Sequence, residues 1–150
     1  MAAGPEDHPD VQVFDEIRYI EHLVRTTITH KLPVGLTYPQ FEVMNLLSRR
    51  GDGISPLDVA RALQMTKSGL TNTLQRLEAQ GFVLITDDPA DGRRKIVSLT
   101  LAGAAAQAAG LAATRPQLDA LREAFEAGEF AGVLPFLDRL RGWLDHNRPA

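Results

Sequence analysis

Apolar residues recur at helical spacing near both ends of the chain. From residue 13 they fall at intervals of four, three, four and four, which keeps them on one face of a helix about five turns long. A second stripe follows a turn predicted at Gly128, with Pro135 either in the first turn of its helix or at a bend. The two stripes consist of Val13, Ile17, Ile20, Val24 and Ile28, and of Leu134, Leu137, Leu140 and Leu144.

The segment between these stripes carries the start and stop signals of short helices. Thr37, with Gln40 three residues later, is typical of a helix N-terminus, and this helix is predicted to end at Gly51. Ser55 caps a second helix, which has a proline at its first position and extends to about Leu63. A third helix begins after the predicted N-cap Thr66, so the connection between the second and third helices is tight.

The third helix is apolar on one side only. It is predicted to end at Gly81, and two short helices joined in this way form a helix-turn-helix. Hydroxyls and amides can donate to and accept from base edges, so its polar side suits the major groove of DNA. An ordinary solvated face is the alternative interpretation. The apolar side has Leu70, Leu74 and Leu77; the polar side has Ser68, Thr71, Asn72 and Gln75, flanked by Lys67 and Arg76.

Two runs rich in β-branched residues predict a β-hairpin directly after these helices. They are residues 82–86, FVLIT, and residues 95–99, KIVSL, joined by the turn-forming segment DDPADGRR. A hairpin in this place makes the winged variety of helix-turn-helix, whose wing can reach the DNA backbone or the minor groove. Arginine suits a narrow minor groove, because the negative potential there attracts it. We expect Arg94 and Lys95 to meet phosphates where the second strand leaves the tip.

A long alanine-rich helix follows the hairpin. Thr100 is its predicted N-cap, and Gly110 and Pro116 are predicted to weaken and kink it. The pattern as a whole predicts a mainly α fold of the α+β kind, in which a winged helix-turn-helix core with a two-stranded wing lies between N-terminal and C-terminal helices.

Composition narrows the class of protein. The chain of 150 residues fits one domain with a single core, and its lack of cysteine excludes disulfides and thiolate metal sites. Residues 1–12 are predicted to form a disordered tail. No apolar run is long enough for a membrane helix and no leader is recognisable, so we expect a cytoplasmic protein that does not contact a membrane.

The charge balance places a condition on nucleic-acid binding. The net charge is -3, which speaks against a protein that binds nucleic acid over its whole surface. Residues 55–95 have six cations against five acids, whereas residues 1–36, 37–54 and 96–150 have no excess of cations. A DNA-binding protein of this kind has to place each cation well.

Three segments of the chain resemble the multiple-antibiotic-resistance regulator (MarR) family of bacterial transcription factors. They are LTYPQFEVMNLL, SPLDVARALQMTKSGLTNTLQRLEAQGFV and DPADGRRKIVSLTLAG, and the resemblance spans roughly residues 13–145. Its most specific part is the wing, where such proteins carry Asp-x-Arg followed by Val-x-Leu-Thr-x-x-Gly. The matching residues here are Asp91, Arg93, Val97, Leu99, Thr100 and Gly103.

The resemblance implies roles for individual residues. The helix of residues 67–80 is similar to a recognition helix, and Arg93 to the wing-tip arginine that enters the minor groove. Asp91 is similar to the acid that holds this arginine or a neighbouring one. The family often has arginine where this chain has Asn72, and asparagine pairs best with adenine rather than guanine. The predicted DNA-binding set is Thr66, Lys67, Ser68, Thr71, Asn72, Gln75, Arg76, Arg93, Arg94 and Lys95.

The resemblance also implies a homodimer. Residues 13–32 and 101–146 are similar to the family's dimerisation helices, and residues 37–100 to its DNA-binding lobe. A twofold dimer predicts a pseudo-palindromic operator on double-stranded DNA, and a repressor released by a small aromatic or anionic effector is the expected mode of action. No motif identifies the effector-binding residues. The predicted dimer contacts are Val13, Ile17, Ile20, Val24, Leu137, Leu140 and Leu144.

Two other functions remain open alternatives at the level of sequence. An enzyme is disfavoured, because the four histidines are scattered and no metal-binding, nucleophile or phosphate-loop motif is recognisable, so we expect neither a metal nor a cofactor. A winged-helix module that binds protein or RNA instead of duplex DNA would leave Thr71, Asn72 and Gln75 as ordinary surface.

Overall fold

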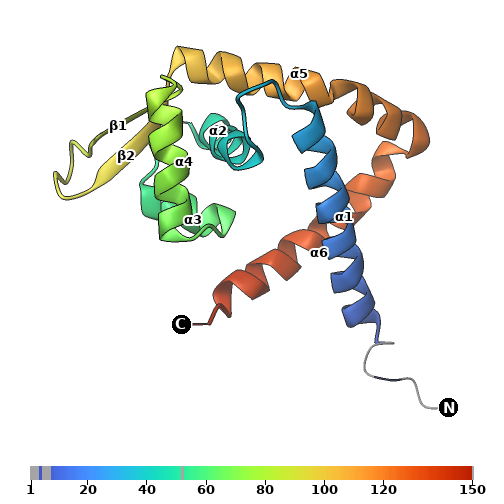
Figure 1. The fold of residues 1–150 in the computed structure, drawn as a ribbon. Coiled ribbons are helices and arrows are strands. Elements are labelled where there is room, and N and C mark those ends of the chain that lie inside the picture. Colours follow the sequence, from blue (N-terminus) through green and yellow to red (C-terminus); the bar gives the residue numbers. More distant parts are fainter. Residues whose placement is uncertain (1–3, 5–7, 52, 150) are drawn as a thin grey trace. The chain divides into compact units, whose positions relative to one another are not determined.

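The computed structural model describes residues 4, 8–51 and 53–149, and within them it has six helices and one two-stranded sheet (Figure 1). This architecture confirms the predicted mainly α fold with a winged helix-turn-helix. The chain divides into two compact units, residues 1–114 and 115–150. The elements are α1 (Pro9–Lys31), α2 (Tyr38–Arg50), α3 (Pro56–Leu63), α4 (Lys67–Ala79), β1 (Val83–Asp87), β2 (Lys95–Leu99), α5 (Leu101–Ala124) and α6 (Ala127–His146).

The predicted capping residues begin the helices of the lobe. Thr37 and Gln40 form a complete capping box, in which each side chain accepts from the other's backbone N–H. Ser55 and Thr66 cap α3 and α4 by accepting backbone N–H bonds of 3.2 and 3.0 Å. Gln64 ends α3 in the left-handed region with φ 54°, and this turn sets the direction in which α4 begins.

The hydrophobic core lies within α2, α3, α4 and the hairpin. Burying each large aliphatic side chain contributes roughly 1.5–3 kcal/mol, so a set of this size holds these elements together. The core is formed by Val43, Met44, Leu47, Val59, Leu70, Leu74, Leu77, Val83 and Val97.

Two glycines let the first half of α5 approach this lobe closely. A Cβ at Gly103 would collide with the backbone oxygen of Phe82, and one at Gly110 would lie 2.5 Å from the ring of Phe41. Between them, the buried Gln107 donates a 2.8 Å hydrogen bond to the side chain of Asn45 on α2. These contacts fix the first half of α5 to the lobe.

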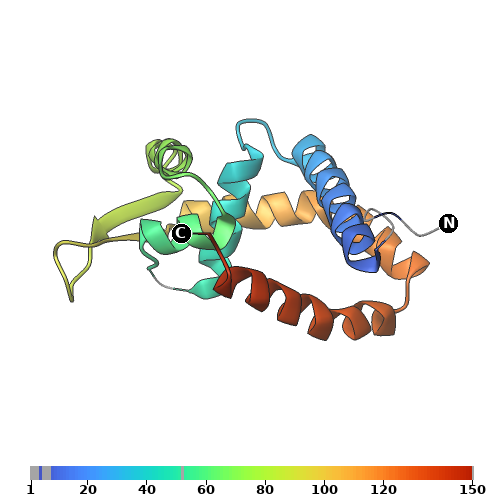
Figure 2. The same ribbon diagram turned by 90° about the horizontal axis from the view of Figure 1, so that it is seen from below.

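The hairpin is tied to the lobe at its base. The antiparallel strands pair from Val83 with Leu99 to Asp87 with Lys95. Ile54, which the sequence did not mark as a strand residue, exchanges two backbone hydrogen bonds with Val97, of 3.1 and 2.8 Å. In Figures 1 and 2 the hairpin projects from the lobe beside α4.

Several predicted boundaries differ from the observed ones. Helix α1 begins at Pro9, because proline suits a first helical turn, so residues 9–12 are not a tail. The remaining residues of that predicted tail include 1–3 and 5–7, which lie outside the described residues. Gly128 is not a turn but lies in the first turn of α6, where the Glu129 carboxylate accepts from the N–H of Glu126 at 2.9 Å.

The two helical prolines lie inside their helices. Pro135 is in the interior of α6 rather than in its first turn. Pro116 is in the interior of α5, and the division between the two units falls at residues 114 and 115, next to it. Because proline cannot donate the hydrogen bond of an interior helical position, α5 lacks one backbone hydrogen bond at Pro116, next to the division between the units.

Candidate nucleic-acid interface

Helix α4 separates an apolar face from a polar one. Leu70, Thr73, Leu74 and Leu77 are buried, and Thr73 satisfies its hydroxyl by donating to Gly69 O at 2.9 Å. The predicted DNA-contacting residues of this helix and its cap are all exposed: Thr66, Lys67, Ser68, Thr71, Asn72, Gln75 and Arg76. The structure therefore brings these predicted residues together on one accessible helix without an acid among them.

The aspartates of the hairpin are used by the hairpin itself. Asp88 accepts from the N–H of Ala90 at 2.9 Å, and Asp91 accepts from the N–H of Arg93 at 3.1 Å. Such side-chain-to-backbone bonds two residues apart stabilise a turn. Asp91, which resembles the acid that holds this arginine or a neighbouring one, thus braces Arg93 through its backbone N–H.

The three wing cations are not equivalent. Lys95 forms an ion pair with Asp87, its cross-strand partner, at 2.5 Å. Arg93 and Arg94 are exposed, and within the part of the chain that the structure describes neither forms an ion pair. The wing accordingly presents two arginines to solvent, whereas Lys95 is already engaged with an acid.

The predicted dimer residues lie on helices that have no buried side chain of their own. No described residue of α1 or α6 is buried. Six of the seven predicted contacts are exposed, and Leu140 is half-buried. Sequence reasoning missed further exposed apolar residues that the same periodicity could have shown: Phe14 and Leu23 on α1, and Phe130 and Val133 on α6.

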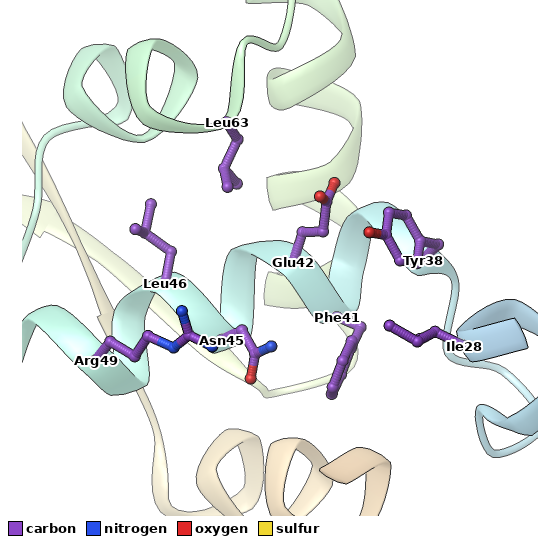
Figure 3. Close-up of a pocket in the computed structure, with 8 residues that line it drawn as sticks. All are labelled: Ile28, Tyr38, Phe41, Glu42, Asn45, Leu46, Arg49 and Leu63. Atoms are coloured by element: carbon purple, nitrogen blue, oxygen red, sulfur yellow. The ribbon is translucent and has the colours of Figure 1, made fainter. Parts of the chain in front are cut away.

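A cavity of about 200 Å³ opens between the end of α1, α2 and the end of α3 (Figure 3). The apolar part of its lining comes from Ile28, Phe41, Leu46 and Leu63, and the polar part from Tyr38, Glu42, Asn45 and Arg49. No sequence motif indicated that these residues would line one cavity, because they come from three helices.

The polar end of this cavity joins α1 to α2. Arg25 is hydrogen-bonded to Glu21 and lies over the ring of Tyr38, 5.3 Å from its centroid. Burial raises the pKa of the Glu42 carboxyl, and the charge of Arg25 opposes this shift. Burial and then the charge of Glu42 raise the pKa of the Tyr38 hydroxyl. Since Asn45 also accepts from Gln107, the cavity wall is connected to α5 as well.

Across the residues that the structure describes, no group of three or more histidines and acids is placed to hold a metal ion. The described helices include none that is both long and apolar enough to cross a bilayer.

Comparisons with known proteins agree on one family. A family model described as "MarR family" matches residues 34–94. Transcriptional regulator HosA of Escherichia coli O127:H6 is 33% identical over 100 residues, which cover 67% of this chain and 73% of HosA. The residues that the family model matches include the whole helix-turn-helix and reach into the wing.

Solved structures show the same fold. A mutant of MarR from E. coli superposes with a TM-score of 0.70 at 25% identity, covering 84% of this chain and 93% of that one. A mutant of MepR from Staphylococcus aureus, solved bound to an oligodeoxyribonucleotide, has a TM-score of 0.59 at 25% identity and covers 88% and 97%.

Proposed function

Because this chain belongs to the MarR family of transcriptional regulators, we propose that it binds duplex DNA as a homodimer at a pseudo-palindromic operator and represses transcription in the cytoplasm. It is a regulator and not an enzyme. The observation that carries the proposal is the exposed hydroxyl and amide face of α4 beside a wing whose two arginines lack an acid partner among the described residues.

The geometry of the first unit suits a groove-binding protein. An α-helix fits the major groove of B-DNA, and the short polar side chains of α4 can reach base edges there. The wing projects beside α4, so Arg93 is available to a neighbouring minor groove and Arg94 to phosphates. This local arrangement explains how a chain with net charge -3 can bind DNA.

The apolar surfaces of α1 and α6 support the dimer. Ile20 is 55% exposed and Leu144 44% exposed, which is costly unless another surface covers them. A second copy of the chain would cover such faces through a twofold interface, and it would place two α4 helices about 34–36 Å apart. An operator with two inverted half-sites follows from that symmetry.

Repression and its release complete the proposal. A dimer on a promoter blocks polymerase sterically, without a further contact. The cavity beside Phe41 and Leu63 is suited to the aromatic body of a small effector. Arg49 stands seven residues from Glu42 on α2, about 10 Å along the helix, so an anionic group is favoured at the Arg49 end. A ligand there would touch Asn45 and could shift α5 through Gln107.

The test is binding of the full chain to duplex DNA from its own promoter region over a series of salt concentrations. We expect log affinity to fall linearly with log salt, because phosphate contacts release counterions. A slope near zero, or preference for an RNA hairpin over the duplex, would contradict the proposal and favour the protein- or RNA-binding alternative.

Two wing variants sharpen this test. Arg93→Ala should weaken operator binding by about 1–3 kcal/mol without unfolding the protein, as circular dichroism would verify. Lys95→Ala is the matched control: its ammonium is paired with Asp87, so its removal should cost less binding. Equal losses for both variants would mean that the wing contributes only general positive charge.

A further inference from the structure

Two amide side chains stand next to each other on the exposed face of α4. Asn72 and Gln75 are three residues apart, a rise of about 4.5 Å along the helix axis. Consecutive base pairs are stacked about 3.4 Å apart. Both residues are exposed, and among the described residues neither amide is engaged in a hydrogen bond within the chain. The pair can therefore address two neighbouring base pairs.

The chemistry of an amide selects among bases. A side-chain amide offers one acceptor and one donor group side by side, which matches N6 and N7 of adenine. Guanine presents two acceptors, O6 and N7, which match the paired donors of arginine. The two cations of α4, Lys67 and Arg76, lie at the flanks of this face rather than between the amides. Its centre therefore favours adenine.

The neighbouring Thr71 also favours A·T base pairs. The hydroxyl of Thr71 donates to Lys67 O at 2.8 Å, so its proton is used inside the helix. What Thr71 can present to the groove is a methyl group and an accepting lone pair. The methyl group of thymine is an apolar partner for the Thr71 methyl group, and thymine is the base paired with adenine.

We propose that α4 recognises two adjacent A·T base pairs in each half-site, with Asn72 and Gln75 each bonded to an adenine and the Thr71 methyl against a thymine methyl. This specificity rests on the proposed DNA-binding function and goes beyond it. The wing would add a separate preference at the neighbouring minor groove, because runs of A·T pairs narrow the groove that Arg93 would enter.

The first experiment is selection of binding sites from a randomised duplex library by the full chain. We expect an inverted repeat with two adjacent A·T pairs in each half-site. The inference would be overturned, and operator binding left intact, by an inverted repeat with G·C at every base pair whose preference changes when Asn72 or Gln75 is substituted. A library without any enriched site would overturn operator binding itself, and the inference with it.

Substitutions then assign the positions. Asn72→Arg should change one adenine preference in each half-site to guanine, with discrimination of roughly five- to 150-fold. Val34→Arg is the control, since it adds a positive charge at a fully exposed loop position outside α4, the wing and the predicted dimerisation helices, and it should leave the selected site unchanged. If Asn72→Arg kept both adenine preferences, Asn72 would not contact a base.

A chemical change in the DNA tests Thr71 separately. Replacing the contacted thymine by uracil removes one methyl group and should lower wild-type affinity roughly fourfold, from about 0.8 kcal/mol per buried methylene-sized group. Thr71→Ser keeps the hydroxyl and lacks the methyl, so this variant should not distinguish thymine from uracil. If wild type and Thr71→Ser respond to uracil alike at every thymine, the methyl contact is excluded.

Discussion

The winged lobe and the outer helices differ in where their apolar stripes lie. In the lobe, Val43, Leu77 and Val97 are fully buried within one chain. On α1 and α6, side chains at the same kind of helical spacing stay exposed, with Ile20 at 55% and Leu144 at 44%. The lobe thus completes its core alone, whereas α1 and α6 carry surfaces that a single chain leaves uncovered.

This contrast shows what periodicity does and does not mean. An apolar stripe at helical spacing indicates that one face of a helix is buried, but it does not indicate which surface covers that face. The covering surface of the α4 stripe is found in the same lobe, in α2, α3 and β1. For α1 and α6 we propose a second copy. Four substitutions test the distinction, and the first three have a matched control.

The largest effect is expected in the lobe core. Leu77→Ala removes a fully buried side chain and should lower the free energy of unfolding by about 2–5 kcal/mol, since it leaves a cavity. Leu84→Ala removes the same atoms from a β1 position that is 54% exposed and should cost far less. Urea denaturation followed by circular dichroism measures both. Similar losses of unfolding free energy for both variants would contradict the claim that the lobe completes its hydrophobic core within one chain.

The second effect separates assembly from folding. Ile20→Glu places a charge on the apolar face of α1 and should weaken dimerisation by about 2–4 kcal/mol, because a charge buried at an interface loses its hydration. His22→Glu adds a similar charge to the same helix, two residues away and outside the stripe, and should leave the dimer intact. Sedimentation velocity over a dilution series measures the difference. Unchanged association for Ile20→Glu would remove α1 from the interface.

The third effect compares two helical glycines. Gly103→Ala should destabilise the protein by about 1–3 kcal/mol, because its methyl group would strike the backbone of Phe82. Gly142→Ala on α6 meets no atom within 4 Å and should stabilise the protein by about 0.4–1 kcal/mol. Thermal unfolding should shift in opposite directions for the two variants. A loss for Gly142→Ala would instead mean that a partner closely covers that side of α6.

The smallest effect concerns the cavity between α1 and the lobe. Burial raises the folded-state pKa of Glu42 above its usual 4.5, so the folded state holds a proton more tightly than the unfolded one. Stability from this residue is therefore lost as pH rises through its usual pKa to the raised one. Glu42→Gln should remove that pH dependence, an effect below about 1 kcal/mol because solvent screens a half-exposed group. Identical pH profiles for both proteins would contradict it.

The local signals of the sequence were sufficient for most of the lobe. Thr37, Ser55, Thr66 and Thr100 all cap the helices that they were predicted to cap, because a hydroxyl bond to a nearby N–H is decided within three residues. The first strand of the hairpin was predicted one residue too early, at residues 82–86 instead of Val83–Asp87. The first helix begins at Pro9 instead of after residue 12, and Gly128 lies in a helix instead of a turn. Proline and glycine are compatible with a first helical turn as well as with a loop.

Contacts between distant segments were beyond the sequence pattern. The bonds of Ile54 to Val97 and of Asn45 to Gln107 join residues more than forty positions apart, and neither pair has a local signature. The wing charges show the same limit. Composition could not say that Lys95 would pair with Asp87 while Arg93 and Arg94 stayed exposed, because strand register decides which side chains face each other.

The sequence by itself determined the helix-turn-helix, the wing and the exposed polar set on α4, because capping, turn chemistry and helical periodicity act over a few residues. It also pointed to a family, through the run from Asp91 to Gly103. Only the tertiary structure decided which stripes are buried, why Gly103 has no room for a side chain, and where a cavity opens. Those properties depend on how close distant segments pack, and no short stretch of the chain contains that information.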